Sequence, residues 1–256
     1  AVSFGTGIGT TAVSTSRSGA NLLLNVNVTG NTGRVTVQNY FNAQETEEIR
    51  FADDTIWDVA TVRAKVLAAS STSGNDLILG YESNDTINSL AGNDTVYAGA
   101  GNDVIDGGLG SDTLYGEDGD DVINAGSGDS NKASVVNNLY GGNGNDVLIA
   151  SGKPDQLFGG PGNDIYHGGA GANWLEDSGG NNVMDGLSGN DQLRGGDQND
   201  LVIGNTGNDL FDGDRDANGV RGRDIVLFNK ADGTDTVTRL GTGSTLSIGG
   251  GTLYSN

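Results

Sequence analysis

The stretch G-G-N-G-N-D-V-L-I-A-S-G-K-P-D-Q-L-F-G-G-P-G-N-D-I-Y-H, residues 141–167, decides the fold of this 256-residue chain. It contains three nonapeptides, in each of which a turn leads to an Asp and a large apolar residue stands two positions later (Leu148, Leu157 and Tyr166). Gly supplies the positive φ angles that such turns need. The three residues that remain can form a short strand whose middle side chain faces inward. Two nonapeptides therefore predict one coil of 18 residues with two short parallel strands.

The same period extends over most of the chain beyond residue 72. Its Asp positions form two series with a spacing of nine: Asp76, Asp85, Asp94, Asp103, Asp112 and Asp121, then Asp146, Asp155, Asp164, Asn173, Asn182, Asp191, Asp200 and Asp209. A further Asp, Asp224, precedes a strand-like segment that ends at Phe228. A flexible linker would not keep an apolar residue at a fixed phase, so the pattern predicts stacked coils that bury a thin apolar ladder between two sheets.

The composition limits what the chain can do. It has 34 acidic and 13 basic residues, a net charge of −21, no Cys, and His167 as its one His. This balance excludes nucleic-acid binding through a basic face. The absence of Cys excludes disulfides and thiolate sites, and a single His argues against a zinc site or a His-based triad. No apolar run approaches the length of a transmembrane segment.

The pattern resembles the repeat-in-toxin (RTX, haemolysin-type) calcium-binding proteins, whose nonapeptide is G-G-x-G-x-D-x-U-x with U large and apolar. The resemblance covers roughly residues 72–228. It implies an all-β fold, a parallel β-roll that winds as a right-handed solenoid, and multiple Ca²⁺ ions between successive turns. The metal ligands that it implies are Asp76, Asp85, Asp94, Asp103, Asp112, Asp121, Asp146, Asp155, Asp164, Asp191, Asp200, Asp209 and Asp224, with Gly99, Gly101, Gly108, Gly110, Gly142, Gly144, Gly160 and Gly162 in the turns.

The stacking geometry gives calcium a clear role. Loops two nonapeptides apart lie on the same edge, so Asp76, Asp94 and Asp112 line one edge. Asp85, Asp103 and Asp121 line the other. Without a cation, carboxylates stacked roughly 5 Å apart repel one another. Ca²⁺ binds six to eight carboxylate and carbonyl oxygens, which these turns supply.

Some loops depart from the pattern. Ser83, Lys153 and Gln198 replace a Gly, and Asn173 and Asn182 replace the Asp, so we expect weak calcium binding there or none.

Two interruptions break the count of nine. Between Asp121 and Asp146 seven extra residues enlarge the loop through Ser127–Val136, and Asn137 takes an Asp position. One calcium site there is expected to be lost, or rebuilt with Asp129. The segment Gly213–Gly222 starts like an EF-hand loop but lacks the Glu at the twelfth position, which favours a solvated loop or an irregular calcium loop.

Residues 1–70 lack the nonapeptide repeat, and their sequence predicts a small β-rich module with one helix. Strands are expected over Leu22–Val28, Arg34–Gln38 and Glu48–Phe51, and Asp58 can cap a helix over Val59–Leu67. The run from V-T-V-Q-N-Y-F (35–41) to the end of that helix resembles the haemolysin-type calcium-binding-related module that precedes nonapeptide arrays. Its expected role is to cap the first coil, with Phe51 and Trp57 in the core.

The chain therefore divides into a capping module (1–70), a first roll tract (71–126), an enlarged loop (127–140), a second roll tract (141–228) and the start of a following module (229–256). The last expectation rests on V-T-R-L-G-T-G (237–243), which echoes V-S-F-G-T-G (2–7).

The resemblance implies a secreted bacterial protein, exported by type I secretion machinery, that folds on calcium in the extracellular space or at the cell surface and is flanked by neighbouring modules. We expect a structural or adhesive role. The alternative is a non-catalytic accessory domain of a secreted protease, lipase or epimerase. No catalytic motif supports an enzyme, and His167, Asp106, Asp185 and Asp212 read as outward-facing strand residues.

Overall fold

The computed structural model describes residues 2–28, 31–38, 40–41, 48–127, 135–213, 222–228, 233–241, 243–248 and 252–255. The chain forms two compact units, Ala1–Ser71 and Thr72–Asn256. Each unit is described by itself. Within the described residues no helix is long and apolar enough to cross a membrane.

The N-terminal unit contains two small sheets and one helix. One sheet has the antiparallel order β2 (Val13–Ser18), β3 (Asn21–Val28) and β4 (Asn31–Val37). The other has the order β1 (Val2–Ser3), β5 (Ile49–Arg50) and β6 (Ile56–Trp57). A short 3₁₀ turn, η1, spans Thr10–Ala12, and the helix α1 spans Val59–Ser70.

Local chemistry explains where the helix begins and what it covers. The main-chain N–H of Thr61 donates to Oδ1 of Asp58, 2.8 Å away, which caps the first turn as predicted. Val62 and Val66 are buried in one core with Phe51 and Trp57, whose rings lie 4.7 Å apart. The expected helix and the expected core aromatics are confirmed.

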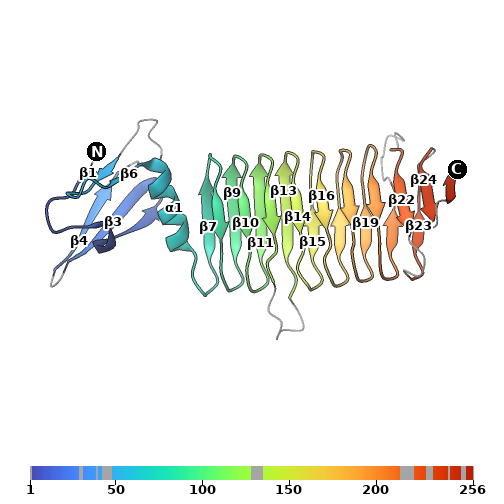
Figure 1. Cartoon of the computed structure of the whole chain (residues 1–256), viewed down its shortest axis with the longest axis horizontal. Helices are drawn as coiled ribbons and strands as arrows, with labels where there is room; N and C mark the ends of the chain where they lie inside the picture. Colours follow the sequence, from blue (N-terminus) through green and yellow to red (C-terminus); the bar gives the residue numbers. More distant parts are fainter. Residues whose placement is uncertain are drawn as a thin grey trace. The chain divides into compact units, whose positions relative to one another are not determined.

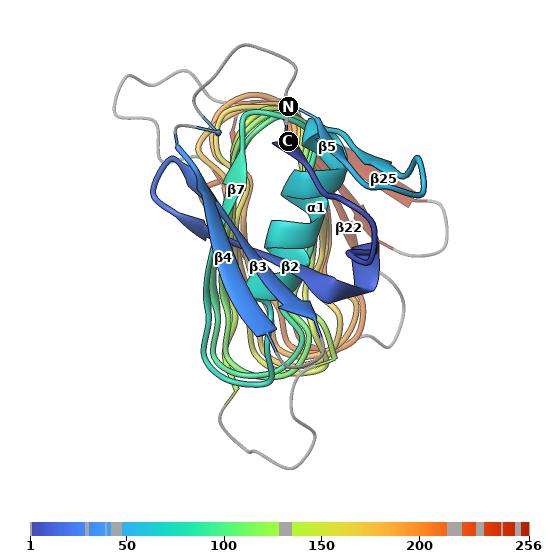
Figure 2. The same cartoon turned by 90° about the vertical axis from the view of Figure 1, so that its left-hand side faces the viewer.

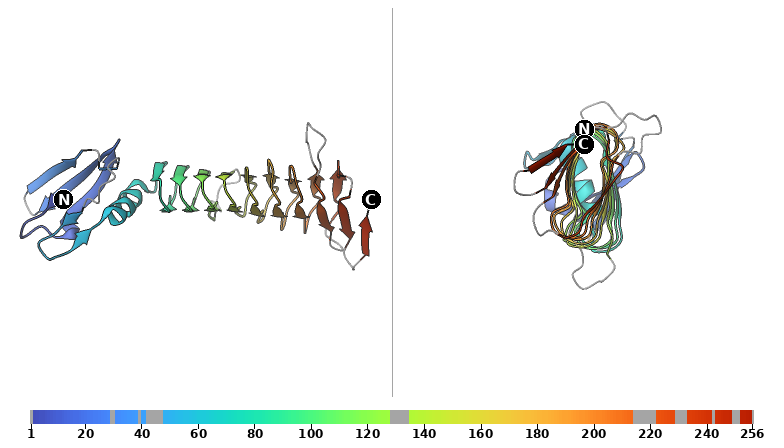
Figure 3. Two further views of the ribbon diagram at one scale, coloured as in Figure 1. Left: turned by 90° about the horizontal axis from the view of Figure 1, so that it is seen from above. Right: turned by 90° about the vertical axis from the view of Figure 1, so that its right-hand side faces the viewer.

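The second unit is a parallel β-solenoid of two facing sheets (Figures 1 and 3). The nine-stranded sheet contains β7 (Leu77–Tyr81), β9 (Thr95–Ala100), β11 (Thr113–Asp118), β13 (Asn138–Asn143), β15 (Gln156–Phe158), β17 (Trp174–Glu176), β19 (Gln192–Arg194), β21 (Leu210–Asp212) and β23 (Thr236–Thr238). The ten-stranded sheet contains β8 (Thr86–Asn88), β10 (Val104–Asp106), β12 (Val122–Asn124), β14 (Val147–Ile149), β16 (Ile165–His167), β18 (Val183–Asp185), β20 (Leu201–Ile203), β22 (Ile225–Phe228), β24 (Thr245–Ile248) and β25 (Thr252–Ser255).

The strand register confirms the coil length. Val104 pairs with Val122, 18 residues later, and seen along the stack the coils nearly superimpose (Figure 2). The pairing of Thr113 with Asn138 spans 25 residues, so the enlarged loop adds seven residues and leaves the register intact. Of the two interruptions, residues 128–134 and 214–221 lie outside the described residues, and with them the expectations for Asp129 and for the EF-hand-like segment.

The predicted apolar ladder is the core of the roll. One side chain from each strand between β7 and β22 points between the sheets and is at most 3% exposed: Ile78, Ile87, Val96, Ile105, Leu114, Ile123, Leu139, Leu148, Leu157, Tyr166, Leu175, Met184, Leu193, Val202, Phe211 and Val226. Each coil thus buries two apolar side chains and little more, so the turns contribute much of what specifies the stack.

The roll continues beyond Phe228, where the sequence pattern placed its end. Strand β23 pairs in parallel with β21, and β24 pairs in parallel with β22. The nine-residue spacing did not predict these added strands, because the pairing of Leu210 with Thr236 spans 26 residues, eight more than one coil. The division of the chain at residue 229, with a following module after it, stays a proposal.

Candidate metal sites along the two edges

The Asp residues of the turns form two continuous ladders, one along each edge of the roll. The first ladder is Asp76, Asp94, Asp112, Asn137, Asp155, Asn173, Asp191, Asp209 and Asp235. The second ladder is Asp85, Asp103, Asp121, Asp146, Asp164, Asn182, Asp200, Asp224 and Ser244. In both, the side-chain oxygen of one member accepts the main-chain N–H of the member one coil before it. This contact uses one carboxylate oxygen, Oδ1, and leaves the other for a different partner.

The second oxygen is buried without a hydrogen-bond partner at several of the described ladder positions. Six of these are the Oδ2 atoms of Asp94, Asp103, Asp112, Asp121, Asp146 and Asp191. The residues are between 0% and 2% exposed. A buried ionised carboxylate without a partner for one oxygen is costly, and a bound cation removes that cost.

Glycine leaves room for such a cation beside four of these oxygens, those of Asp112, Asp121, Asp146 and Asp191. A Cβ built on Gly141 would lie 2.3 Å from Oδ2 of Asp146 and 2.6 Å from the carbonyl oxygen of Gly159, one coil later. The same arrangement recurs at Gly116, between Asp121 and the carbonyl of Gly141. We call this space a cradle. It lies between the first Gly of a turn, the Asp of the same turn and the main-chain carbonyl one coil later.

The donors around a cradle are all oxygens. Within the described residues no three acidic or His side chains gather into a cluster, so a metal here must combine carboxylates with main-chain carbonyls. This mixture suits Ca²⁺, whereas Mg²⁺ demands a tight octahedron and retains its water. The residues present therefore fit calcium.

The electrostatics of the ladders point the same way. Burial raises the pKa of Asp103 to about 6 and that of Asp112, Asp146 and Asp191 to about 7. The charge of the neighbouring ladder carboxylates raises these pKa values further, while the hydrogen bond from the main chain lowers them. A cation in the cradle would offset both burial and repulsion and keep the carboxylates ionised.

At three of the Asp positions implied by the sequence, Oδ2 accepts a main-chain N–H of the protein. Oδ2 of Asp76 accepts the main-chain N–H of Thr72, that of Asp85 accepts from Tyr81, and that of Asp155 accepts from Ser151. The second contact is 2.7 Å long and the third 2.6 Å. The nonapeptide spacing does not separate these positions from the six above.

The two Asn substitutions occupy the cradle with their own amide. Nδ2 of Asn173 donates to the carbonyls of Gly168 and Gly171, at 2.6 and 3.2 Å. Nδ2 of Asn182 donates to the carbonyl of Gly195 at 3.2 Å. The amide therefore binds turn carbonyls without a metal, in line with the expected weakness of these loops.

The cradle of Asp164 holds protein groups as well. A Cβ on Gly159 would lie 2.2 Å from the hydroxyl of Tyr166, 2.3 Å from Oδ2 of Asp164 and 2.6 Å from Oδ2 of Asp177. Asp177 stands where the other turns have their first Gly, and Tyr166 replaces an aliphatic core residue. Sequence reasoning did not connect the two residues, since they lie 11 positions apart.

The turn glycines behave as expected. Those implied as site residues all have positive φ: Gly99, Gly101, Gly108, Gly110, Gly142, Gly144, Gly160 and Gly162. Gln198, which replaces such a Gly, also adopts a positive φ of 77°.

A further ladder, absent from the sequence-based expectations, links the residues just before the Asp. The main-chain N–H of Asn93 donates to Oδ1 of Asn75, and that of Asn102 donates to Oδ1 of Asn84. The contact recurs along the roll as far as Thr234 and Asn208. The repeated N-D dipeptide was its signal in the sequence.

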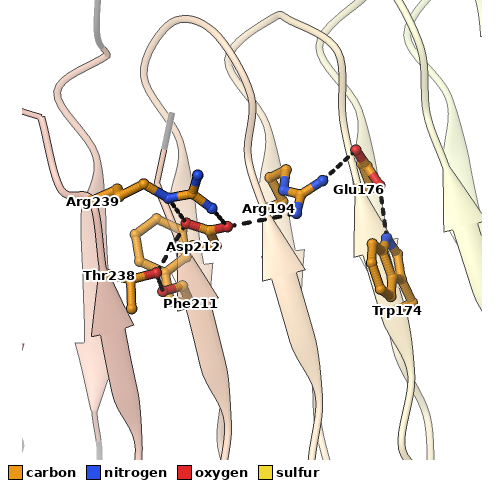
Figure 4. Close-up of polar contacts among 7 residues, drawn as sticks. All are labelled: Trp174, Glu176, Arg194, Phe211, Asp212, Thr238 and Arg239. Atoms are coloured by element: carbon orange, nitrogen blue, oxygen red, sulfur yellow. Dashed lines mark hydrogen bonds and ion pairs between the residues drawn. The ribbon is translucent and has the colours of Figure 1, made fainter. Parts of the chain in front are cut away.

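The outer face near the C-terminal end carries a chain of ion pairs (Figure 4). Arg194 lies between Glu176, at 2.7 Å, and Asp212, at 3.5 Å, and Arg239 also donates to Asp212. Asp212 faces outward, as its position one residue past the core predicts, but it is only 9% exposed. Two arginines cover it.

Comparison with known families agrees with this geometry. The family model described as RTX calcium-binding nonapeptide repeat matches residues 70–105, 97–130, 140–175, 167–202, 176–211 and 185–220. The model described as haemolysin-type calcium binding protein related domain matches residues 23–61, which lie in the N-terminal unit. The repeat matches cover more than half of the chain, and with its two ladders of turn Asp residues the chain belongs to the RTX calcium-binding nonapeptide repeat family, whose repeats bind multiple Ca²⁺ ions.

Proposed function

We propose that this chain is a structural, adhesive segment of a larger bacterial protein, exported unfolded by type I secretion machinery and folded by calcium outside the cell. Its neighbours in this proposal are further modules of the same chain. Low cytosolic calcium leaves the acidic repeats unpaired and unfolded, and high external calcium folds them.

The burial of unpartnered carboxylate oxygens in the cradles carries this proposal. These six Oδ2 atoms are buried without a hydrogen-bond partner, four of them lie beside a cradle glycine, and burial opposes the ionisation of Asp103 and Asp112. A metal-free roll at neutral pH must either repel itself along both edges or take up protons. Calcium removes this conflict.

Among the implied ligands, we assign calcium first to Asp112, Asp121, Asp146 and Asp191, since each pairs a buried Oδ2 with a cradle glycine, and next to Asp94 and Asp103, whose Oδ2 atoms are also buried. An ion bound only by the folded chain stabilises it by about 2.7 kcal/mol at a hundred times its Kd. Several such ions can supply the stability that a two-residue core per coil lacks.

A calcium titration followed by far-UV circular dichroism tests the folding step. The β signal should appear cooperatively with calcium, disappear with excess EDTA, and not return with magnesium. A β spectrum that EDTA leaves unchanged would contradict the proposal.

A load-bearing role in an adhesive protein has its own test. Single chains pulled between their ends should resist force in calcium and extend without a peak after chelation. If the force trace were the same in both conditions, calcium would not serve a mechanical function.

A further inference from the structure

A groove of about 720 Å³ crosses the outer face of the nine-stranded sheet, where β9, β11, β13 and β15 end. It lies entirely within the roll, and its walls are outward-facing side chains. Its lining also includes Gly141 and Gly159, so the main chain of two cradles borders it, but no ladder carboxylate is among its lining residues. It has an aromatic wall, a glycine floor and an acidic wall. The aromatic wall contains Tyr115, Tyr140 and Phe158, and the acidic wall contains Glu82, Glu117 and Asp118.

The aromatic wall is a ladder of stacked rings. The ring centroids of Tyr97 and Tyr115 lie 4.7 Å apart, those of Tyr115 and Tyr140 also 4.7 Å, and those of Tyr140 and Phe158 5.0 Å. Successive planes are within 10° of parallel. Because the rings cover one another's faces, the groove meets their edges. A ligand there contacts apolar carbon, and stacking of a sugar ring or a cation on a ring face is not available.

The floor is main chain. Gly99, Gly142 and Gly160 line the groove and bring no side chain into it, so a ligand can approach the backbone closely. The groove crosses the four strands at the coil spacing, which gives it a length on the order of 14 Å. About four residues of an extended peptide occupy that length.

The acidic wall fixes the charge of the ligand. Glu82, Glu117 and Asp118 line the groove, and no Lys, Arg or His is among its lining residues in the described part of the chain. Glu117 has a φ of 78°, at the turn position where the flanking coils have Gly99 and Gly142.

We propose that this groove binds an extended peptide segment rich in Lys or Arg. The cationic heads pair with the acidic wall, and the aliphatic stems lie along the ring edges. A second copy of this chain does not fit, since its net charge of −21 brings acid against acid. The proposal goes beyond the calcium-dependent folding above and concerns other side chains.

The test is fluorescence anisotropy of a short fluorescein-labelled peptide of alternating Lys and Ser, titrated with the whole chain in saturating calcium. The test variant is Glu117→Gly with Asp118→Asn. It places at position 117 the Gly that the flanking coils have there, so the fold should be retained. The matched control is Asp197→Asn, an exposed acid at the same turn position of the same edge, outside the groove.

The test variant should weaken peptide binding roughly three- to tenfold, as expected for two solvent-exposed charge pairs. The control should leave binding unchanged, and a Glu-Ser peptide should not bind. Circular dichroism in calcium should be the same for all three chains.

Equal affinity of the test variant and the parent chain would overturn the proposal, as would an equal loss in the control. Release of calcium by the peptide would also overturn it, because the peptide would then be acting on the cradles. If the test variant did not fold, Glu82→Gln would take its place, with the same expected direction.

Discussion

The hydroxyl of Tyr166 donates a hydrogen bond to Oδ2 of Asp177, 2.5 Å away, beside the turn that Asp164 closes. The same hydroxyl accepts the main-chain N–H of Gly159 at 2.7 Å. In the preceding coil, the corresponding space beside Gly141 and Asp146 contains no such group. Burial raises the pKa of Asp177 to about 7 and also raises that of Asp164, which favours a shared proton over an ion. One coil of the roll is thus closed by its own side chains.

We predict that Tyr166→Leu combined with Asp177→Gly converts this coil into a further calcium site. The substitutions restore the residue types of the other coils and leave Oδ2 of Asp164 facing an open cradle. Isothermal titration calorimetry should count one more bound ion per chain than in the parent. Asp197→Gly, which removes an exposed acid elsewhere, should not change the count. An unchanged count in the double variant would show that Asp164 is unsuited to calcium for another reason.

A methyl group in a cradle should remove its ion. In Gly141→Ala the new Cβ would lie 2.3 Å from Oδ2 of Asp146, where the cation is expected, so calcium binding and the calcium-dependent melting temperature should fall. Gly152→Ala is the matched control, because a Cβ there meets nothing within 4 Å. Differential scanning fluorimetry with and without calcium separates the two. A similar loss in both variants would point to general backbone strain.

The raised pKa values predict how the metal-free chain responds to pH. Asp103, Asp112, Asp146 and Asp191 have pKa values of about 6 to 7 when folded, against about 3.9 in an unfolded chain. The folded state then binds more protons, so the stability that these four groups contribute is fully present below about pH 4 and is lost as the pH rises through about 7.

Circular dichroism of the calcium-depleted chain should accordingly show more β structure at pH 5 than at pH 8. Calcium should abolish this difference at neutral pH and release protons as it binds, measurable in a weakly buffered solution. A metal-free chain that became more stable as the pH rose would show that the ladder carboxylates are ionised without calcium.

Much of this architecture could be predicted from sequence because it repeats. The coil length, the buried side chain of each strand and the positive φ of the turn glycines all follow from a local pattern of nine residues. Asp58 and the helix it caps are equally local.

What the sequence did not show depends on contacts between coils or on the ends of the stack. Thr72, Tyr81 and Ser151 each donate to the Asp four residues later, and they stand where most coils have a residue of positive φ, a difference that the nine-residue spacing does not show. Asp235 was missed because the extra residues before it break the count, although Gly233, Asp235 and Val237 keep the G-x-D-x-U spacing.

The ion-pair chain should stabilise its end of the roll independently of calcium. Arg194→Leu removes the cation between Glu176 and Asp212, both mostly buried from solvent, and should cost about 1 kcal/mol or more with or without calcium. Arg50→Leu, which breaks an exposed pair with Glu48, should have little effect. Chemical denaturation in calcium and in EDTA provides the comparison, and a loss seen in calcium alone would assign Arg194 to the metal sites.

Restoring the carboxylates at the two Asn positions should make the roll bind more calcium and depend on it more. In the parent chain Nδ2 of Asn173 and Nδ2 of Asn182 donate to turn carbonyls, so these cradles need no ion. Asn173→Asp and Asn182→Asp replace each donor with an acceptor that faces the same carbonyls, and without a cation the oxygens repel. The double variant should therefore melt lower than the parent in EDTA, bind additional ions in calcium, and gain a larger calcium-induced rise in melting temperature. Asn199→Asp, which adds a charge to the exposed Asn ladder, controls for net charge and should bind no additional ion. If the double variant bound no more calcium than this control, the amides of Asn173 and Asn182 would not stand in the place of a metal ion.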